Sequence, residues 1–296
     1  MLDCLIIGAG PSGMTAAIYL SRANMKCKIL EKMGAGGKMT ATSVIENYPG
    51  VERVDGFELA VKMQTQVEEL GIEIVNSEVE KIIKGNGFFE VVAEGETIQA
   101  KTLIVATGTT ERKLNIPSEE KFINKGISFC AICDGGFYRG KDVAVIGGGN
   151  SALEEALYLA RLCTKVYLVH RRDEFRGESV LVNKVKHTPN IELVLNSQVE
   201  EFMGTNKLEQ IKLNTGRIIN VSGCFEYVGQ YANSSLVKEF GVLNDEGYIL
   251  VDQNQSTKIF GLYAAGDVCE KKFRQITTAT SDGTIAALSI ATALKS

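Results

Sequence analysis

Apolar and polar positions follow the same order in two stretches of the chain, residues 5–32 and 143–172. Each stretch begins with a short apolar run, passes through a glycine-rich turn into a segment of helical periodicity, and ends in a second apolar run. This order predicts the strand–helix–strand unit of a dinucleotide-binding sheet. The chain therefore contains two related nucleotide-binding folds, and its 296 residues are enough for two domains.

The remaining segments predict further strands and a C-terminal helix. Apolar runs at 72–79, 88–92 and 98–100 indicate short strands that alternate or pair, and 102–108 is typical of a buried strand. A helical pattern covers 278–294. We therefore expect the first domain to be partly antiparallel.

Two connections mark the predicted domain boundaries. The polar, proline-containing segment 113–118 is typical of a linker, and the turn-forming residues at 244–247 suggest a second crossing. The second domain, 115–243, is therefore expected to be inserted into the first, 1–114 plus 244–296. The predicted fold class is α/β, with two Rossmann-like domains of three-layer ββα architecture.

The first glycine turn has the residues that bind a dinucleotide. Gly8, Gly10 and Gly13 form G-x-G-x-x-G between a strand and a helix, where backbone N–H groups and the helix dipole can hold a pyrophosphate. Glu31 ends the next strand, where a carboxylate can accept hydrogen bonds from ribose hydroxyls. A turn whose glycines only permit close packing is the alternative, but the strand, helix and acid together favour binding.

The second glycine turn, at Gly147 and Gly149, is followed by cations instead of an acid. The position that corresponds to Glu31 holds His170, and Arg171, Arg172 and Arg176 follow it. An adenosine 2′-phosphate is repelled by a carboxylate and attracted by arginines, so this domain is predicted to prefer NADP. A solvated basic loop is the alternative interpretation.

Cys130 and Cys133 form a C-x-x-C motif that is followed by Asp134. Zinc would need two further ligands at suitable spacing, which isolated cysteines and two histidines do not supply. Two buried free thiols are a second alternative. A redox pair explains more, because this spacing can close a short disulfide and Asp134 can supply or take a proton. We assign no chemistry to the other cysteines, which are Cys4, Cys27, Cys163, Cys224 and Cys269.

Composition excludes several other classes of protein. A net charge of −4 with scattered Lys and Arg gives no basic stripe for nucleic acid. No apolar run approaches the roughly 18–20 residues that span a bilayer, and the N-terminus shows no signal peptide. We therefore expect a cytoplasmic protein that binds neither nucleic acid nor membrane.

Six motifs, in this order, resemble those of the low-molecular-weight, FAD-containing thioredoxin reductases, class II members of the pyridine nucleotide-disulfide oxidoreductases. They are GAGPSG with Glu31, ATG at 106–108, CAICD at 130–134, GGGNSA at 147–152, HRRDEFR at 170–176, and AAGD at 264–267 with RQI at 274–276. The resemblance covers essentially the whole chain. Lys38 departs from it, because the family usually has Gln there, and so do Ile132, where Thr is commoner, and the segment 224–235.

The resemblance implies two sets of cofactor-binding residues. The predicted FAD site comprises Gly8, Gly10, Pro11, Ser12, Gly13, Glu31, Lys32, Gly37, Lys38, Asn47, Val79, Ala106, Thr107, Gly108, Gly266, Asp267, Arg274, Gln275 and Ile276. The predicted NADPH site comprises Gly147, Gly148, Gly149, Asn150, Ser151, His170, Arg171, Arg172 and Arg176.

The same resemblance implies the activity. NADPH is expected to reduce FAD, FAD to reduce the disulfide of Cys130 and Cys133, and the dithiol to reduce oxidised thioredoxin. Cys133 is expected against the flavin, Cys130 as the attacking thiol and Asp134 as acid or base. A homodimer and a rotation of the inserted domain are also implied. The alternatives are a related reductase with another protein acceptor or with ferredoxin as donor, a disulfide-forming oxidase, and a redox sensor without turnover.

Overall fold

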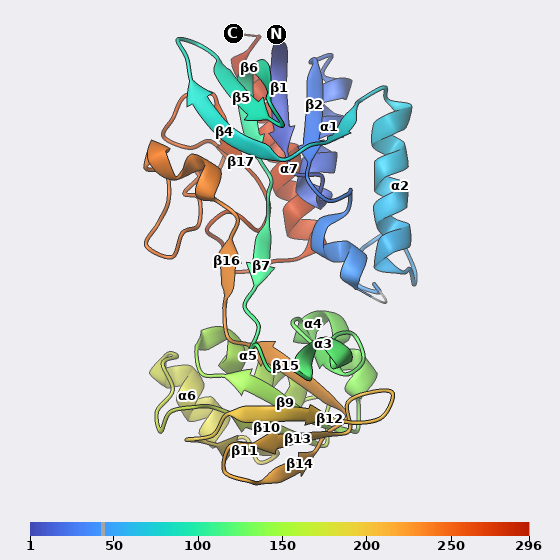
Figure 1. The fold of residues 1–296 in the computed structure, drawn as a ribbon, viewed down its shortest axis with the longest axis vertical. Coiled ribbons are helices and arrows are strands. Elements are labelled where there is room, and N and C mark those ends of the chain that lie inside the picture. The colour runs from blue at the N-terminus through green and yellow to red at the C-terminus, as the bar shows by residue number, and fades with distance from the viewer. Residues whose placement is uncertain (43–44, 296) are drawn as a thin grey trace. The chain divides into compact units, whose positions relative to one another are not determined.

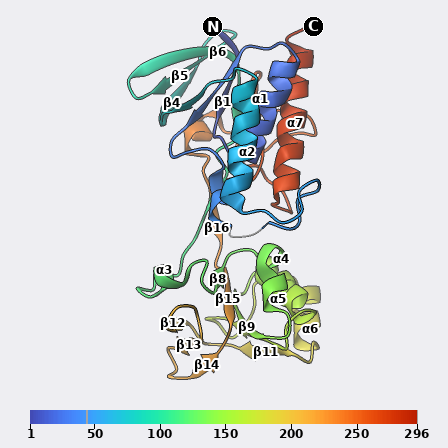
Figure 2. The ribbon, with the colours of Figure 1, turned by 90° about the vertical axis from the view of Figure 1, so that its right-hand side faces the viewer.

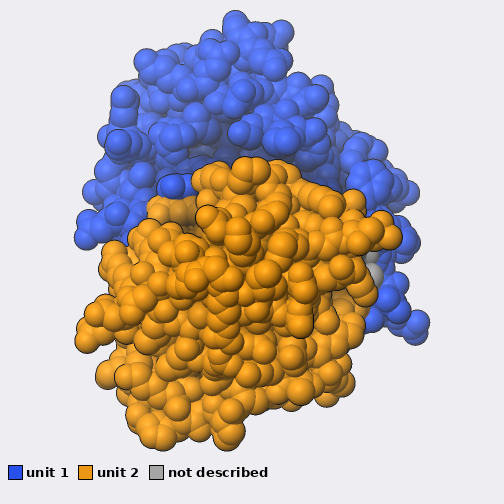
Figure 3. Space-filling model, turned by 60° about the horizontal axis from the view of Figure 1, so that its bottom comes forward, with its two compact units in different colours: residues 1–110, 231–296 blue, residues 111–230 orange. Residues whose placement is uncertain are grey.

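The computed structural model describes residues 1–42 and 45–295 and divides the chain into two compact units, shown in Figure 3. Unit 1 comprises residues 1–110 and 231–296, and unit 2 comprises residues 111–230. The second boundary therefore lies earlier in the chain than position 243/244, where we expected it. The turn at Asn244 does form, because its side-chain Oδ1 accepts hydrogen bonds from the backbone of Glu246 and Tyr248, but it lies inside unit 1.

Unit 1 is built on a seven-stranded sheet of order β3-β2-β1-β6-β5-β4, with β17 also paired to β6 (Figure 1). Strands β1, β2, β3, β6 and β17 are parallel neighbours, whereas β4, β5 and β6 are antiparallel. This confirms that the first domain is partly antiparallel. The strands are β1 (Leu2–Ile7), β2 (Cys27–Glu31), β3 (Ile74–Asn76), β4 (Val79–Lys84), β5 (Phe89–Ala93), β6 (Glu96–Val105) and β17 (Leu262–Ala264).

The two runs that we expected as separate strands near residue 100 form the single ten-residue strand β6. Residues 96–100 of this strand pair with β5, and residues 100–105 pair with β1. The polar Lys101 between the two runs interrupts the apolar pattern without interrupting the strand, because one face of a strand can be exposed where the other is buried.

Helices cover one face of the unit 1 sheet, and Figure 2 shows α1, α2 and α7 together on that side. The helices of this unit are α1 (Pro11–Arg22), α2 (Gly56–Glu69), α7 (Ile276–Ala293) and the 3₁₀ turns η1 (Gly37–Ala41) and η3 (Ser235–Phe240). Ile6 of β1 packs under the helices, while Leu5 and Ile7 pack in a second core on the opposite face. Burial on both faces explains why residues 4–7 of β1 are continuously apolar.

Unit 2 has a parallel sheet of order β11-β10-β9-β15-β8 and a separate antiparallel sheet of order β12-β13-β14. Val143 and Val145 of β9 pack against the helices, and Ala144 and Ile146 pack on the side of the small sheet. These three layers confirm the predicted ββα architecture. The strands are β8 (Ile127–Ser128), β9 (Asp142–Gly147), β10 (Lys165–Val169), β11 (Ile191–Val194), β12 (Val199–Met203), β13 (Gln210–Leu213), β14 (Ile218–Asn220) and β15 (Gly223–Tyr227).

The helices of unit 2 are short except for α5, which follows the second glycine turn. They are α3 (Glu119–Phe122), α4 (Ala131–Asp134), α5 (Asn150–Ala160), α6 (Ser179–Lys186) and the 3₁₀ turn η2 (Gly135–Tyr138). The two segments in which the chain passes from one unit to the other, β7 (Thr109–Glu111) and β16 (Gln230–Ala232), pair as a two-stranded sheet.

Unit 2 contains two buried carboxyl groups. The Glu119 carboxylate, at the start of α3, accepts hydrogen bonds from the backbone N–H groups of Leu114 and Ile116 at 3.1 and 3.2 Å. Glu226, on β15, is 3% exposed, and its burial together with the charge of Glu119 raises its pKa to about 9. Glu226 is therefore protonated in the folded protein at neutral pH.

This raised pKa predicts that Glu226→Gln stabilises the protein more at pH 8 than at pH 5. The folded state keeps a proton that the unfolded state releases, so the wild type loses stability as pH rises from the unfolded pKa, near 4.5, toward about 9. The neutral amide has no such loss, and we expect its gain in stability to be larger at pH 8 than at pH 5 by on the order of 4 kcal/mol, because each pH unit between the two pKa values costs the wild type about 1.4 kcal/mol. The change in stability is measured from urea unfolding midpoints at both pH values. The substitution Glu209→Gln, at an exposed position, is the control. Equal effects at the two pH values would contradict the assignment.

Candidate active site and nucleotide-binding turns

The first glycine turn connects β1 to α1, and its glycines differ in their surroundings. Gly8 has φ +107°, and a Cβ there would lie 2.4 Å from the carbonyl oxygen of Ala106. A Cβ at Gly13 would lie 2.0 Å from the carbonyl oxygen of Gly8. At Gly10 a Cβ would have no described protein atom within 4 Å. Packing therefore accounts for Gly8 and Gly13, whereas Gly10 leaves the backbone open to a ligand such as a pyrophosphate.

The second glycine turn, between β9 and α5, repeats this arrangement. Gly147 has φ +153°, and a Cβ there would lie 2.6 Å from the carbonyl oxygen of Tyr227. A Cβ at Gly149, the equivalent of Gly10, would meet no described protein atom within 4 Å. Asn150 begins α5 and exchanges two hydrogen bonds with Glu178, at 3.0 and 2.8 Å. Both turns thus leave the middle glycine open at the start of a helix.

Glu31 is fixed beside the first turn. Its carboxylate accepts hydrogen bonds from the backbone of Ala9 at 2.7 Å and of Met33 at 3.0 Å. Each carboxylate oxygen has a second lone pair, so the group can still accept a ribose hydroxyl. Lys32, the next residue, lies 3.8 Å from Glu78 in an exposed ion pair.

His170 differs from the arginines that follow it, because its ring is buried. The ring stacks on Phe175 with centroids 5.3 Å apart, and a Cβ at Gly148 would lie 2.2 Å from it. Burial, followed by the nearby arginines, lowers the pKa of His170. Arg171, Arg172 and Arg176 are exposed. The arginines, and not His170, therefore carry the positive charge of this cluster.

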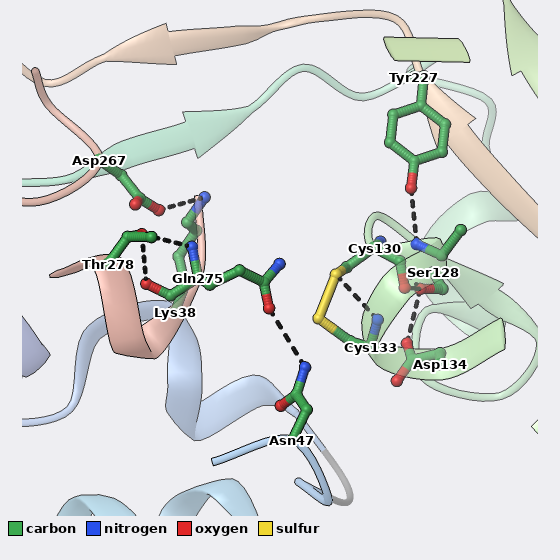
Figure 4. The surroundings of a disulfide bond; sticks show 11 residues. Lys38, Asn47, Ser128, Cys130, Cys133, Asp134, Tyr227, Asp267, Gln275 and Thr278 are labelled. Carbon is green, nitrogen blue, oxygen red and sulfur yellow. Dashed lines mark hydrogen bonds and ion pairs between the residues drawn. A yellow bond between two sulfur atoms is a disulfide. The ribbon is translucent and has the colours of Figure 1, made fainter. Parts of the chain in front are cut away.

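Asp267 has a buried oxygen atom without a partner. Its Oδ1 has no hydrogen-bond partner among the described residues, and its Oδ2 lies 3.6 Å from the ammonium of Lys38 (Figure 4). Lys38 also donates to the hydroxyl of Thr109 at 2.7 Å. A buried oxygen of this kind fits a hydroxyl donor of a bound molecule.

Further predicted FAD-site residues gather near the start of α7. Gln275 caps this helix in a reciprocal pair of hydrogen bonds with Thr278, and its side chain accepts from Asn47 at 3.2 Å (Figure 4). The guanidinium of Arg274 lies 4.5 Å from the ring centroid of Tyr248. Ile276 is the first residue of the helix. The sequence did not point to Thr278, because a threonine carries no signal of this role.

The remaining predicted FAD-site residues lie at strand ends and turns of unit 1. Thr107 follows β6, and its hydroxyl donates to the carbonyl oxygen of Asn233 at 2.6 Å. Gly37 begins η1, and Val79 is the buried first residue of β4. The others are Pro11 and Ser12 in the first turn of α1, Ala106 and Gly108 beside Thr107, and Gly266 before Asp267. Ser151, from the predicted NADPH site, lies in the first turn of α5 in unit 2.

Cys130 and Cys133 form a disulfide at the start of α4 (Figure 4). Cys130 precedes the helix, and the backbone N–H of Cys133 lies 3.2 Å from its sulfur. The pair is therefore not two free thiols. The other five cysteines are free, and burial raises the pKa of each thiol above its ordinary value, which disfavours thiolates. Among the described residues, no three His, Cys, Asp or Glu side chains gather as a metal site.

Asp134 follows the disulfide directly and holds a fixed position. Its Oδ2 accepts a hydrogen bond from the hydroxyl of Ser128 at 2.6 Å. Burial raises the pKa of Asp134. A carboxyl group with a raised pKa on the residue that follows the redox pair can give and take the protons of thiol–disulfide exchange.

The sequence model of the pyridine nucleotide-disulphide oxidoreductases matches residues 2–283. The chain belongs to this family. A thioredoxin reductase of Ureaplasma parvum is 42% identical over 97% of this chain and 94% of its own length. The thioredoxin reductase of Bacillus subtilis is 40% identical over 97% of this chain and 93% of its own length.

Two solved structures of thioredoxin reductases share the fold of this chain. The structure of thioredoxin reductase from Streptococcus pyogenes is 40% identical and aligns with a TM-score of 0.95 over 100% of this chain and 98% of that one. The one from Giardia duodenalis is 36% identical with a TM-score of 0.95 over 100% of this chain and 99% of that one. The chain is therefore an oxidoreductase with two nucleotide-binding domains.

Thioredoxin reductases of this pyridine nucleotide-disulphide oxidoreductase family use FAD and NADPH, and the residues of this chain fit both groups. The open Gly10, the fixed carboxylate of Glu31 and the unpartnered oxygen of Asp267 fit the phosphates and hydroxyls of FAD. The open Gly149 and the exposed arginines fit NADPH. In the described part of the chain, no helix is long and apolar enough to cross a membrane.

The two open glycines predict separable losses of the two cofactors. We expect Gly10→Ala to lower the amount of FAD bound per chain, because the methyl group occupies the space of the pyrophosphate. Gly149→Ala should leave the FAD content unchanged and raise the KM for NADPH by about 10-fold or more, which corresponds to about 1.4 kcal/mol. Flavin absorbance per chain and steady-state kinetics measure the two effects. Each variant is the control for the other. Loss of FAD in both variants would contradict the assignment of Gly10 to the FAD site and of Gly149 to the NADPH site.

Proposed function

We propose that this enzyme reduces the disulfide of oxidised thioredoxin with electrons from NADPH. The observation that carries the proposal is the Cys130–Cys133 disulfide at the start of α4, in the same unit as the second open glycine turn. The relatives of about 40% identity that bear the name thioredoxin reductase support the choice of acceptor. We assign the FAD site to unit 1 and the NADPH site to unit 2.

FAD, when bound, supplies the transfer of an electron pair between a nicotinamide and a disulfide. Reduction of the Cys130–Cys133 bond takes two electrons and two protons and gives two thiols. The Cys130 thiolate then attacks a sulfur of the thioredoxin disulfide, which forms a mixed disulfide and releases one thioredoxin thiolate. Attack of Cys133 on the Cys130 sulfur releases the second. The family resemblance supports this order of the two cysteines.

Asp134 handles protons in this cycle. With a raised pKa and a hydrogen bond from Ser128, its carboxyl group can protonate the leaving thiolate and later take a proton from a cysteine thiol. The buried free cysteines have no place in the exchange, because burial keeps them as thiols.

The arginine cluster selects the donor. Arg171, Arg172 and Arg176 are exposed and lie in the loop that follows β10, and the ribose of a dinucleotide is held at the end of this strand in this fold. A 2′-phosphate accepts charge-assisted hydrogen bonds from guanidinium groups, which favours NADPH over NADH and over a protein donor such as ferredoxin.

We further propose a rotation of unit 2 relative to unit 1 during turnover, a homodimer, and a cytoplasmic location. The passage of the chain between the units at only two described positions, 110/111 and 230/231, supports the rotation. The dimer and the location rest on the family resemblance.

The electron path predicts how the flavin absorbance changes in stopped-flow experiments. NADPH should bleach the flavin of the wild type, Cys130→Ser and Cys133→Ser, because neither cysteine is needed for hydride transfer. Oxidised thioredoxin should then restore the absorbance of the wild type only, with turnover of the two variants below about 1%. Cys163→Ser, which removes a buried free thiol, should behave as the wild type. Thioredoxin-dependent reoxidation in Cys130→Ser would refute the path.

The donor assignment predicts a change in the preference for NADPH. We expect Arg171→Ala and Arg172→Ala each to raise the KM for NADPH by about 10-fold, because a charge-assisted hydrogen bond is lost. The KM for NADH should change little. Steady-state kinetics with both donors measure this, with the exposed Lys186→Ala as a control for loss of one cation. An equal rise for both donors would show that these arginines do not contact the 2′-phosphate.

A further inference from the structure

Tyr227 is the last residue of β15, and its ring lies on the helical face of the unit 2 sheet. Successive residues of a strand point to opposite faces, and Tyr227 packs with Phe225 in the core that contains Ala131, Leu153 and Ala156. Cys224 packs in the core on the other face. The phenol is therefore directed toward the redox motif and not toward the small antiparallel sheet.

The hydroxyl of Tyr227 accepts a hydrogen bond of 2.6 Å from the backbone N–H of Ala131 (Figure 4). Ala131 lies between the two cysteines and is the first residue of α4, so its N–H has no acceptor within the helix. Ala131 is fully buried, and water cannot replace the bond. Tyr227 thus satisfies a buried donor of the redox motif from a position 96 residues later in the chain.

The phenol of Tyr227 stays neutral where it meets the redox motif. Burial, followed by the charge of Glu155, raises the pKa of Tyr227 well above its ordinary value. A phenolate would repel a cysteine thiolate, whereas the neutral hydroxyl accepts the hydrogen bond without adding charge. The contact therefore persists at every pH at which the dithiol works.

The backbone of Tyr227 is held by the second glycine turn. Tyr227 pairs with Gly147 across β15 and β9, and a Cβ at Gly147 would lie 2.6 Å from the Tyr227 carbonyl oxygen. The close approach fixes the end of β15. A rigid strand end then carries the hydroxyl that holds Ala131.

We propose that Tyr227 is a positioning residue that holds the Cys130–Cys133 motif in the geometry that closes its disulfide. The inference rests on the redox role of this pair in the proposed function. The dithiol must lose conformational freedom to hold the Ala131 N–H against Tyr227, whereas the disulfide has already lost it, so the hydrogen bond is stronger in the disulfide state. Tyr227 therefore favours the disulfide over the dithiol.

The test is a redox titration of the FAD-loaded enzyme and its Tyr227→Phe variant. Mixtures of reduced and oxidised dithiothreitol set the equilibrium, in which two thiols of the enzyme and one oxidised dithiothreitol give the enzyme disulfide and reduced dithiothreitol. Alkylation and mass spectrometry count the thiols of Cys130 and Cys133. Because one net hydrogen bond is lost, we expect the disulfide to be about 5-fold less favoured in the variant, or about 20 mV. Tyr167→Phe, the same substitution elsewhere in unit 2, should leave the constant unchanged.

A role of Tyr227 in packing alone would lower stability equally in both redox states, so a constant within about 2-fold of the wild type would overturn the proposal. Failure of the wild-type pair to titrate at all would instead refute the proposed function. If Tyr227→Phe does not fold, amide hydrogen exchange of the wild type decides. The Ala131 N–H should exchange more slowly in the oxidised than in the reduced enzyme, and equal protection in the two states would refute the inference.

Discussion

The close approach of each glycine turn to the neighbouring strand is the constraint on which the rest of the structure depends. Gly8 packs against the carbonyl oxygen of Ala106, and Gly147 packs against that of Tyr227. Both glycines have positive φ, so any side chain would meet backbone that cannot move without shifting a strand. The approach brings the helix that follows each turn onto its sheet and leaves the middle glycine, Gly10 or Gly149, open.

The same constraint reaches the redox centre in unit 2. Because Tyr227 is held by Gly147 at its backbone, its hydroxyl is held in position against Ala131, between the two cysteines. One residue thus connects the end of a nucleotide-binding turn to the motif that exchanges electrons. Ser128, at the end of β8, holds the other side of the motif, because its hydroxyl donates to the Asp134 carboxylate and accepts from the backbone N–H of Cys130.

Burial divides the polar residues of the chain by role. His170, Glu226 and the five free cysteines are buried or partly buried with pKa values shifted toward their neutral forms, and they fill the interior instead of presenting charge. Arg171 and Arg172 are exposed where a nucleotide can meet them. Asp267 combines both kinds of environment. One of its carboxylate oxygens faces Lys38, and the other is buried without a described partner, which fits a hydroxyl group of a bound molecule.

The sequence by itself determined the two strand–turn–helix units, the partly antiparallel sheet of the first domain and the C-x-x-C pair, because glycine spacing, hydrophobic period and cysteine spacing are local properties. Tertiary structure alone decided that His170 is buried under Gly148, that the chain returns to unit 1 at 230/231, and that Tyr227 bonds to Ala131. These outcomes depend on contacts between residues far apart in the chain. A histidine after a strand, a turn at Asn244 and a tyrosine in an apolar run look the same in the sequence whichever neighbours the fold brings to them.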